Sequence, residues 1–273
     1  MSIPRSNTFT LEDIGTDDRQ GIQSIEVGAV LLQKLNESPR ALSLKELAQR
    51  SDMSAAKAHR YLVSFCRIGL TMQELETGHY DLGPFALSLG LTRLARTDAL
   101  AMARPVARQL RDELDLTVSI AVWGNHGPTL VYWLDSLHPI AVNLKVGAVM
   151  PIARSSNGRC FATYLTPAVV QPLLPKEDWP LLIEATKEVR LHGAARAQSD
   201  LLPGINSFSA AVFDAWGIAQ LVVSVIGHNP QFAVPWSSPA LKSLLNATRR
   251  LSSDLGYRAD LQQLRAEHNE RTE

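Results

Sequence analysis

The chain has 273 residues, 45% of them hydrophobic and 20% charged, and its 27 basic and 27 acidic residues give a net charge of zero. This composition is typical of a globular protein with room for one large or two ordinary domains, each with its own core. The longest apolar runs are far below the roughly 18 residues of a membrane helix, and no secretory signal is visible, so neither a membrane protein nor a secreted one is expected.

The two cysteines, Cys66 and Cys160, lie far apart in the chain. They form neither a disulfide framework nor a zinc-binding pattern, so we expect no metal and no cofactor. Free cysteine is commonly buried, and both are interpreted as core packing rather than as redox sensors. Together with the missing secretory signal, this predicts a cytoplasmic protein.

The chain begins with a polar stretch, residues 1–23, which has mixed charge and no clear period and is expected to be a mobile tail. An amphipathic helix follows and ends before Ser38-Pro39. Its predicted apolar stripe consists of Ile25, Ala29, Leu32 and Leu35.

The stretch 44–69 predicts two helices joined by a tight turn. Ser43 and Glu46 have the spacing of a capping box, in which each residue's side chain satisfies the other's backbone N–H. Ser54 is placed to cap the second helix, which is expected to stop at Gly69.

The second of these helices has two distinct faces. Ala58, Leu62 and Phe65 recur at helical spacing and would pack inward, whereas Lys57, Arg60 and Ser64 share another face. Small residues at the start of the helix, among them Ser54 and Ala55, would let it approach DNA bases closely, with the polar face reaching bases and phosphates. An ordinary helical hairpin with a solvated polar face is the alternative.

The residues after this helix favour DNA binding. Residues 70–83 read as a β-hairpin with its turn near Thr77-Gly78, and three helices followed by a hairpin make a winged helix-turn-helix over residues 24–83. The same segment holds seven Lys/Arg and seven Asp/Glu, so net charge does not support DNA binding. Binding of two half-sites by a dimer would compensate.

Along the remainder of the chain, the spacing of apolar residues changes from the helical period to the strand period. Residues 84–100 predict a linker helix that begins at Pro84, and 101–116 predict another amphipathic helix. Strands are then expected at 117–123, 129–135, 140–144, 205–213 and 219–226, and helices at 155–165, 180–191 and 237–255. Antiparallel strands with helices at the ends predict an α+β domain over residues 101–260, followed by a C-terminal tail at 261–273.

The sequence resembles the IclR family of bacterial transcription regulators. The matching runs are SIEVGAVLLQKL, SLKELAQRSDMSAAKAHRYLVSFCRIGL and the wing that ends in GHYDLGP, and the resemblance extends over about nine tenths of the chain. It implies a C-terminal effector-binding domain similar to GAF and PAS-like sensor folds. It also implies that the linker helix takes part in dimer contacts.

The resemblance places Arg60 at the centre of the recognition helix and His59 where the family has an aromatic residue or histidine. The residues expected to contact DNA are Ser54, Ala55, Lys57, His59, Arg60 and Ser64 on the helix, with Thr77 and His79 on the wing.

Three stretches match family positions around the effector pocket. Their residues are Ser156, Asn157 and Gly158, then Ile205 and Ser207, then Ser224 and Ile226; Pro139 and Val142 match further wall positions. The first stretch is a small, polar turn that opens a helix, where exposed N–H groups favour a carboxylate. Its S-x-G-R version is more similar to family members that govern aromatic-acid breakdown than to those that sense glyoxylate.

Several neighbouring residues keep two interpretations. Arg154 and Arg159 could each pair with a ligand carboxylate, or could be solvated helix residues. Backbone N–H groups and Ser156 are the favoured acid ligands. Trp133 is read as a core residue, with a place in the pocket wall as the alternative, and Asp200 alone stands where many family members carry an acidic pair.

The sequence shows no catalytic motif, and its seven histidines are scattered without metal-ligand spacing, so an enzyme is not expected. We interpret the chain as a ligand-responsive regulator, a homodimer or dimer of dimers, that binds a double-stranded DNA operator and a small organic acid. Two alternatives remain: a ligand sensor whose winged helix contacts protein, and a small-molecule enzyme.

Overall fold

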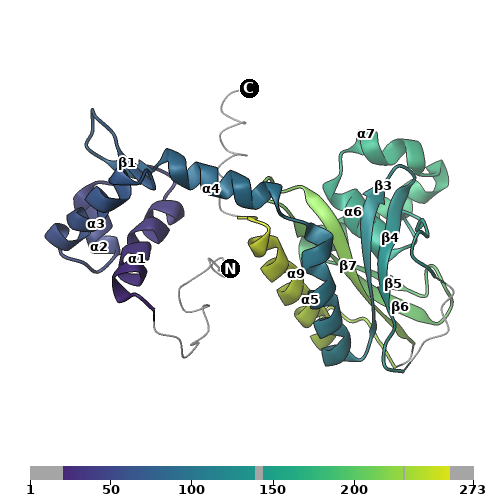
Figure 1. The fold of residues 1–273 in the computed structure, drawn as a ribbon. Helices are drawn as coiled ribbons and strands as arrows, with labels where there is room; N and C mark the ends of the chain where they lie inside the picture. Colours follow the sequence, from purple (N-terminus) through teal and green to yellow (C-terminus); the bar gives the residue numbers. More distant parts are fainter. Residues whose placement is uncertain (1–20, 139–143, 230, 259–273) are drawn as a thin grey trace. The chain divides into compact units, whose positions relative to one another are not determined.

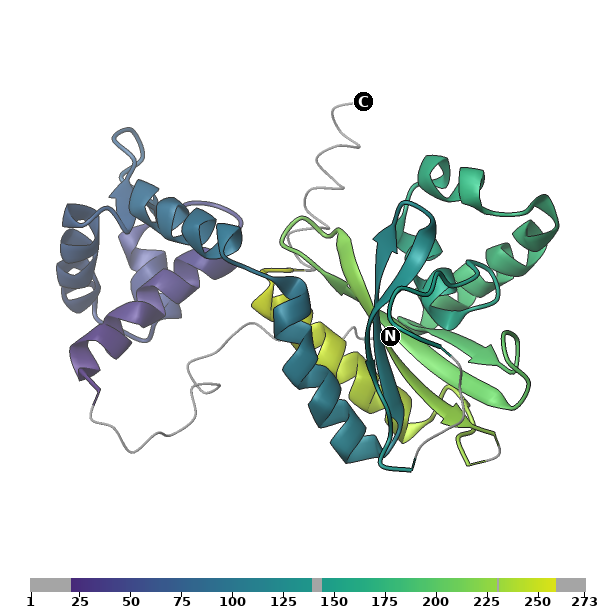
Figure 2. The ribbon, with the colours of Figure 1, turned by 45° about the vertical axis from the view of Figure 1, so that its right-hand side comes forward.

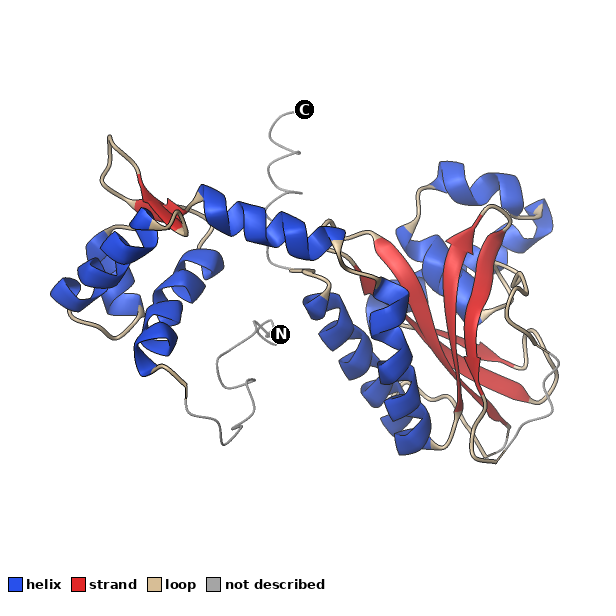
Figure 3. Cartoon of the chain, in the orientation of Figure 1, coloured by secondary structure: helices blue, strands red, loops and turns tan. Residues whose placement is uncertain are grey.

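The computed structural model describes residues 21–138, 144–229 and 231–258. These residues form two compact units, with the division of the chain between Thr97 and Asp98, and each unit is described by itself. Figure 1 labels most of the helices and strands of both units, and Figure 3 colours them by type.

The first unit contains three helices, a two-stranded antiparallel hairpin and a fourth helix. Their bounds are α1 Gln23–Glu37, α2 Leu44–Arg50, α3 Ala55–Arg67, β1 Thr71–Gln73, β2 Tyr80–Leu82 and α4 Pro84–Ala95. The core of this unit is built from Leu31, Leu35, Leu42, Leu47, Ala58, Leu62 and Tyr80. This arrangement confirms the expected winged helix-turn-helix.

The helix ends are set by local sequence. Ser43 Oγ accepts a hydrogen bond from the Glu46 backbone N–H at 3.3 Å, and Glu46 Oε2 accepts one from the Ser43 N–H at 3.0 Å. Ser54 Oγ caps α3 by accepting from the Lys57 N–H at 3.3 Å. Gly69 follows α3 with φ +76°, a left-handed conformation that glycine adopts without steric cost.

The predicted apolar stripe of α1 is wrong at its first position. Ile25 is 66% exposed, and the buried residues of the helix are Gly28, Leu31 and Leu35. A Cβ atom on Gly28 would lie 2.8 Å from Phe65 Cζ, so the helix faces α3 along the side where the missing side chain allows close approach. A sequence pattern that considers only large apolar residues does not identify such a glycine as a buried position.

The second unit is a five-stranded antiparallel sheet with helices on both faces, as Figure 2 also shows. The strand order is β4-β3-β7-β6-β5. The elements are α5 Ala99–Leu114, β3 Thr117–Gly124, β4 Gly127–Leu134, α6 Ser156–Tyr164, α7 Pro167–Val170, α8 Trp179–His192, β5 Ala195–Gln198, β6 Ile205–Phe213, β7 Ala219–His228 and α9 Pro239–Asp254, with 3₁₀ turns at Gln171–Leu173 and Lys176–Asp178.

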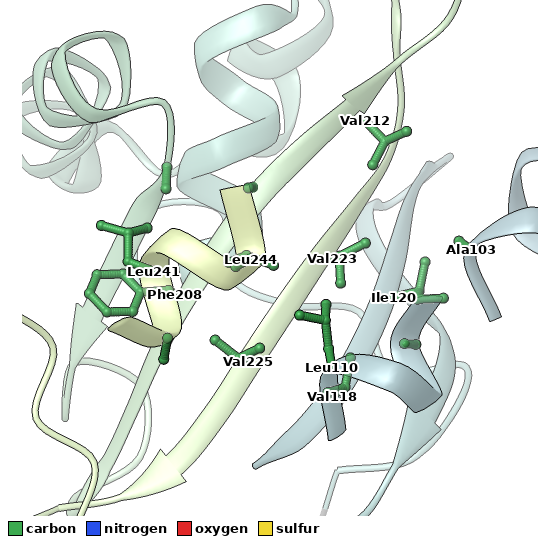
Figure 4. Packing of buried hydrophobic residues seen from close by; sticks show 14 of the residues in the cluster. Ala103, Leu110, Val118, Ile120, Phe208, Val212, Val223, Val225, Leu241 and Leu244 are labelled. Atoms are coloured by element: carbon green, nitrogen blue, oxygen red, sulfur yellow. The ribbon is translucent and has the colours of Figure 1, made fainter. Parts of the chain in front are cut away.

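Alternation along the strands separates the two faces of the sheet. One set of side chains packs against α5 and α9, and Figure 4 shows Val118 and Ile120 of β3 beside Val223 and Val225 of β7 in that layer. The alternate set faces α6 and α8, where Ala121, Ala211 and Val222 pack around Cys160 and Phe161 of α6. The layer against α5 and α9 is mainly apolar, with Asn206 as a buried polar residue. The layer against α6 and α8 is interrupted by polar residues, the buried serines Ser119, Ser209 and Ser224.

The structure confirms the α+β class and an antiparallel sheet in the C-terminal part of the chain. It also contains the short strand β5, which the sequence did not predict. Helix α4 ends at Ala95 rather than at the predicted residue 100, and α5 begins at Ala99. Residues 140–143 of one predicted strand lie outside the described residues. Among the helices that the structure describes, none is long and apolar enough to cross a membrane.

Candidate functional site

The first candidate site is the outer face of α3. Ser54, Ala55, Lys57, His59 and Arg60 are all exposed, and Ser64 is exposed one turn further on. Ala58 and Leu62 are completely buried on the opposite side. Because Ala58 and Leu62 hold one face of α3 in the core, the opposite face, which carries Lys57 and Arg60, is the one available for binding.

Charge is distributed unevenly over this unit. Two of its cations are bound to acids away from α3, in the ion pairs Lys34–Glu37 at 2.8 Å and Arg40–Glu46 at 2.6 Å. The Arg40 guanidinium, with further hydrogen bonds from Ser43, lowers the pKa of Glu46 to about 2. Helix α3 itself carries no acidic residue. Its outer face is thus basic although residues 24–83 together carry no net charge.

The two predicted wing residues differ in their surroundings. Thr77 is exposed, and its hydroxyl donates to Glu74 Oε2 at 2.6 Å while accepting from the His79 N–H at 3.1 Å. His79 is half-buried. Thr77 therefore shapes the turn of the wing, and its hydroxyl is already engaged.

The second candidate site is a cavity of about 460 Å³, its open mouth included, in the polar-interrupted layer of the sheet. The first turn of α6 forms one side of it and strands β3, β6 and β7 form its floor. Its lining residues are Ser119, Leu130, Trp133, Leu144, Met150, Ser155, Ser156, Asn157, Ala197, Leu201, Leu202, Ile205, Ser207, Ser224 and Ile226.

Serine hydroxyls from three elements form a continuous chain beside this cavity. Ser209 Oγ donates to Ser156 Oγ at 2.7 Å, Ser156 is also 2.7 Å from Ser207 Oγ, and Ser209 is 2.7 Å from Ser224 Oγ. A serine hydroxyl has one hydrogen to donate. Because Ser209 donates it to Ser156, Ser224 must be the donor in its hydrogen bond with Ser209. The chain ties the start of α6 to β6 and β7.

The start of α6 is also suited to an anion. Ser155 is the N-cap and its Oγ accepts from the Gly158 N–H at 3.1 Å. The N–H groups of Ser156 and Asn157 belong to the first turn, where no intrahelical acceptor exists. Helix dipole and free donors together favour a carboxylate at this end of the cavity.

Gly158 has a packing role. A Cβ atom there would lie 2.4 Å from the carbonyl oxygen of Ile152, so only glycine lets α6 start against this turn. Gly158 does not line the cavity.

The two arginines of the turn have protein partners. Arg159 is buried, and it donates to the carbonyl oxygens of Ala153 at 2.6 Å and Arg196 at 2.7 Å and to Asp200 Oδ2 at 2.8 Å. Arg154 is exposed and pairs with Asp178 at 3.1 Å. Asp200 thus holds Arg159 in place, and neither arginine lines the cavity.

Six of the nine predicted effector residues line the cavity together: Ser156, Asn157, Ile205, Ser207, Ser224 and Ile226. Pro139 and Val142 lie outside the described residues. Trp133 lines the cavity, so its alternative placement in the wall is the one observed. Sequence reasoning missed Ser119 and Ser209, although a serine at an inward position of a buried strand was the available signal.

Both cysteines are free, and Cys160, a residue of α6, is completely buried against the sheet. Burial raises the pKa of its thiol to about 12, which makes it unreactive near neutral pH. Within the described residues, no group of three His, Cys, Asp or Glu side chains is placed to hold a metal ion.

Comparisons with known proteins cover both units. The family model for the C-terminal domain of the bacterial transcriptional regulator IclR matches residues 91–253, and the model for the IclR helix-turn-helix domain matches residues 24–74. The HTH-type transcriptional regulator BhcR of Paracoccus denitrificans is 23% identical over 90% of this chain and 92% of its own length. The transcriptional repressor IclR of Escherichia coli K12 is 25% identical over 76% of this chain and 80% of its own.

Solved structures agree with these matches. Pseudomonas aeruginosa HmgR has a TM-score of 0.82 and 36% identity, and the match covers 87% of this chain and all of that one. The Agobacterium tumefaciens repressor BlcR has a TM-score of 0.75 at 19% identity, covering 87% of this chain and 99% of its own, and shows the same fold.

Proposed function

The chain belongs to the IclR family of bacterial transcriptional regulators, with a helix-turn-helix DNA-binding domain and a C-terminal ligand-binding domain, and we propose from this premise that α3 reads an operator while the cavity senses a small organic acid. The observation that carries the DNA part is the outer face of α3, which is exposed, basic and free of acidic residues. The relatives are regulators and repressors rather than enzymes.

For the operator, we assign base and phosphate contacts to Ser54, Ala55, Lys57, His59, Arg60 and Ser64. Lys57 and Arg60 lie on the exposed face, and among the described residues no acidic side chain forms an ion pair with either. Bidentate arginine contacts to guanine are the commonest specific contacts in the major groove. Thr77 and His79 on the wing would lie near the DNA backbone.

The assembly proposed is a homodimer or a dimer of dimers bound to an inverted repeat, because two-fold protein symmetry is mirrored in the half-sites. Support comes from α4, where Phe85, Leu87, Leu89 and Leu91 are 45–65% exposed. Large apolar side chains at such density on a described helix are typical of an interface.

For the effector, the proposed acid site combines the first-turn N–H groups of α6 with the hydroxyls of Ser156 and Ser207. Leu130, Trp133 and Met150 would cover the apolar part of the molecule. The apolar Ile226 and the aromatic wall favour an organic acid with an apolar skeleton, aromatic acids included. Binding would alter DNA affinity only to the extent that it favours one arrangement of the DNA-reading heads over another.

The test is an anisotropy titration of the purified protein against labelled DNA from upstream of its own and neighbouring genes, with random DNA as the control. We expect one fragment to bind about 10³-fold or more tighter than random DNA. Affinity should fall steeply between 50 and 200 mM salt, because phosphate contacts release counterions.

The same titration separates the proposal from its rival, a sensor whose winged helix contacts protein. That rival predicts no preferred fragment and little salt dependence. Equal binding of all fragments, with and without candidate acids, would refute the operator assignment.

A further inference from the structure

One polar group of the cavity is left unexplained by the hydroxyl chain. Ser119 lies on β3, is only 1% exposed and lines the cavity, and its Oγ has no hydrogen-bond partner in the structure. By contrast, each of the four serines in the hydroxyl chain, Ser207, Ser156, Ser209 and Ser224, is bonded to at least one other member of it.

An unpartnered hydroxyl at this depth is costly. A buried polar group without a partner destabilises a fold, and alanine would fit the same position on a strand. The neighbouring inward position on β3 is in fact alanine, Ala121, which packs in the apolar layer. Packing alone therefore does not account for a serine at position 119.

The cross-strand register locates Ser119 relative to the acid site. Ser119 is paired with Ser224 of β7, which is paired in turn with Ser209 of β6, the partner of Ser156. Two strand spacings, roughly 10 Å, thus separate the Ser119 backbone from that of Ser209. Ser119 therefore lies across the sheet from Ser209, the residue that bonds to Ser156 at the carboxylate site.

A second unpartnered atom lines the same cavity. Asn157 is 4% exposed, and its Oδ1 accepts no hydrogen bond. A carboxylate offers only acceptors, so it cannot satisfy an amide oxygen, whereas a hydroxyl both donates and accepts. The walls between these polar groups are apolar, with Leu130, Trp133 and Met150.

We propose that Ser119 is a specificity-determining residue and that the effector is a carboxylic acid with an apolar skeleton and a hydroxyl group, which Ser119 recognises beyond the acid site. This inference rests on the proposed effector cavity. Ser119 then selects a hydroxylated acid over its unhydroxylated parent, at a cost to the stability of the unliganded protein.

The first test compares Ser119→Ala with Ser209→Ala in the unliganded full-length protein. All five tryptophans lie in the C-terminal unit, so tryptophan fluorescence follows its unfolding. Ser119→Ala should leave the melting temperature unchanged or raise it by about 2–4 °C, because a buried group without a partner is removed. Ser209→Ala breaks two hydrogen bonds and should lower it.

A melting temperature that falls as far in Ser119→Ala as in Ser209→Ala would overturn the proposal. It would mean that the Ser119 hydroxyl already has a partner in the unliganded protein, and the serine would then be explained by structure alone.

The second test measures binding of matched acids by calorimetry: benzoate against 3- and 4-hydroxybenzoate, propionate against lactate, and butyrate against 3-hydroxybutyrate. At least one hydroxylated acid should bind about 5- to 30-fold tighter than its parent, the value of one good hydrogen bond. In Ser119→Ala this ratio should fall close to one.

Equal affinities within every pair, or a ratio unchanged by Ser119→Ala, would refute the role of Ser119. Failure of every hydroxylated acid to bind at millimolar concentration would refute the ligand class. Neither readout involves DNA, so a failed operator titration would overturn the operator assignment without touching this inference.

Discussion

Arg159 and Arg154 flank the same turn at the start of α6, and the structure predicts very different costs for their removal. The Arg159 side chain is 7% exposed and makes three hydrogen bonds, to two backbone carbonyls and to Asp200. The Arg154 side chain is 56% exposed and makes one ion pair, to Asp178. The two variants Arg159→Ala and Arg154→Ala therefore form a matched pair.

Removal of one member of a buried ion pair costs about 3–5 kcal/mol, because the remaining partners lose their hydrogen bonds. Asp200 is 37% exposed and can regain water, which places Arg159→Ala near the lower end, at about 3 kcal/mol. An exposed pair such as that of Arg154 is worth about 0–1 kcal/mol. A difference of about 2–3 kcal/mol between the variants is expected.

Urea unfolding followed by tryptophan fluorescence measures this difference in the C-terminal unit, since every tryptophan lies there. Arg159→Ala should also weaken acid binding, because Asp200 belongs to the segment that carries Leu201 and Leu202 into the cavity wall. Equal free energies of unfolding for the two variants would refute the reasoning that Arg159 is a buried structural clamp.

Three further predictions concern the units separately. Arg60→Ala should lower operator affinity by about 1–3 kcal/mol per recognition helix, whereas Lys187→Ala, exposed on α8, should leave anisotropy titrations unchanged; similar affinities would contradict the α3 assignment. Glu46 has a folded pKa of about 2, below its ordinary value near 4.3, so its contribution to stability is present above pH 5 and is lost as pH falls toward 2. Thermal unfolding followed by far-UV circular dichroism should show a smaller loss over this pH range in Glu46→Gln, and identical profiles would argue against the Arg40 pair. A fragment of residues 98–273, which begins at the Asp98 cap of α5, should keep the tryptophan-monitored unfolding transition of the whole chain, and a non-cooperative transition would count against this boundary.

Local features of the sequence were sufficient to predict most helices and strands. The capping residues contact groups no more than about one helical turn away in the sequence, so their roles could be predicted without knowing the fold. These residues are Ser43, Glu46, Ser54 and Gly69. Strand alternation likewise identified β6 with both of its ends, because the period of two belongs to the strand itself. The short strand β5 was not predicted, because an alternation of buried and exposed side chains cannot be recognised over only four residues.

The environment of individual side chains depended on contacts that the sequence does not reveal. Arg159 meets Asp200 across 41 positions, and Ser209 meets Ser156 across 53, and both pairings arise only when α6 packs on the sheet. From the sequence, Arg159 was as good a ligand for an acid as Arg154, because residue type reports charge but not burial.

The amino-acid sequence by itself determined most of the helices and strands and the face of α3 that meets solvent, since these follow from local periodicity and capping residues. It also carried the resemblance to the IclR family, through the runs that match the family's winged helix-turn-helix. Only the tertiary structure decided which hydroxyls are bonded to each other, and that the Ser119 hydroxyl in the cavity wall has no partner. The physical reason is that hydrogen bonds between strands depend on register, and register is set by the packing of the whole sheet.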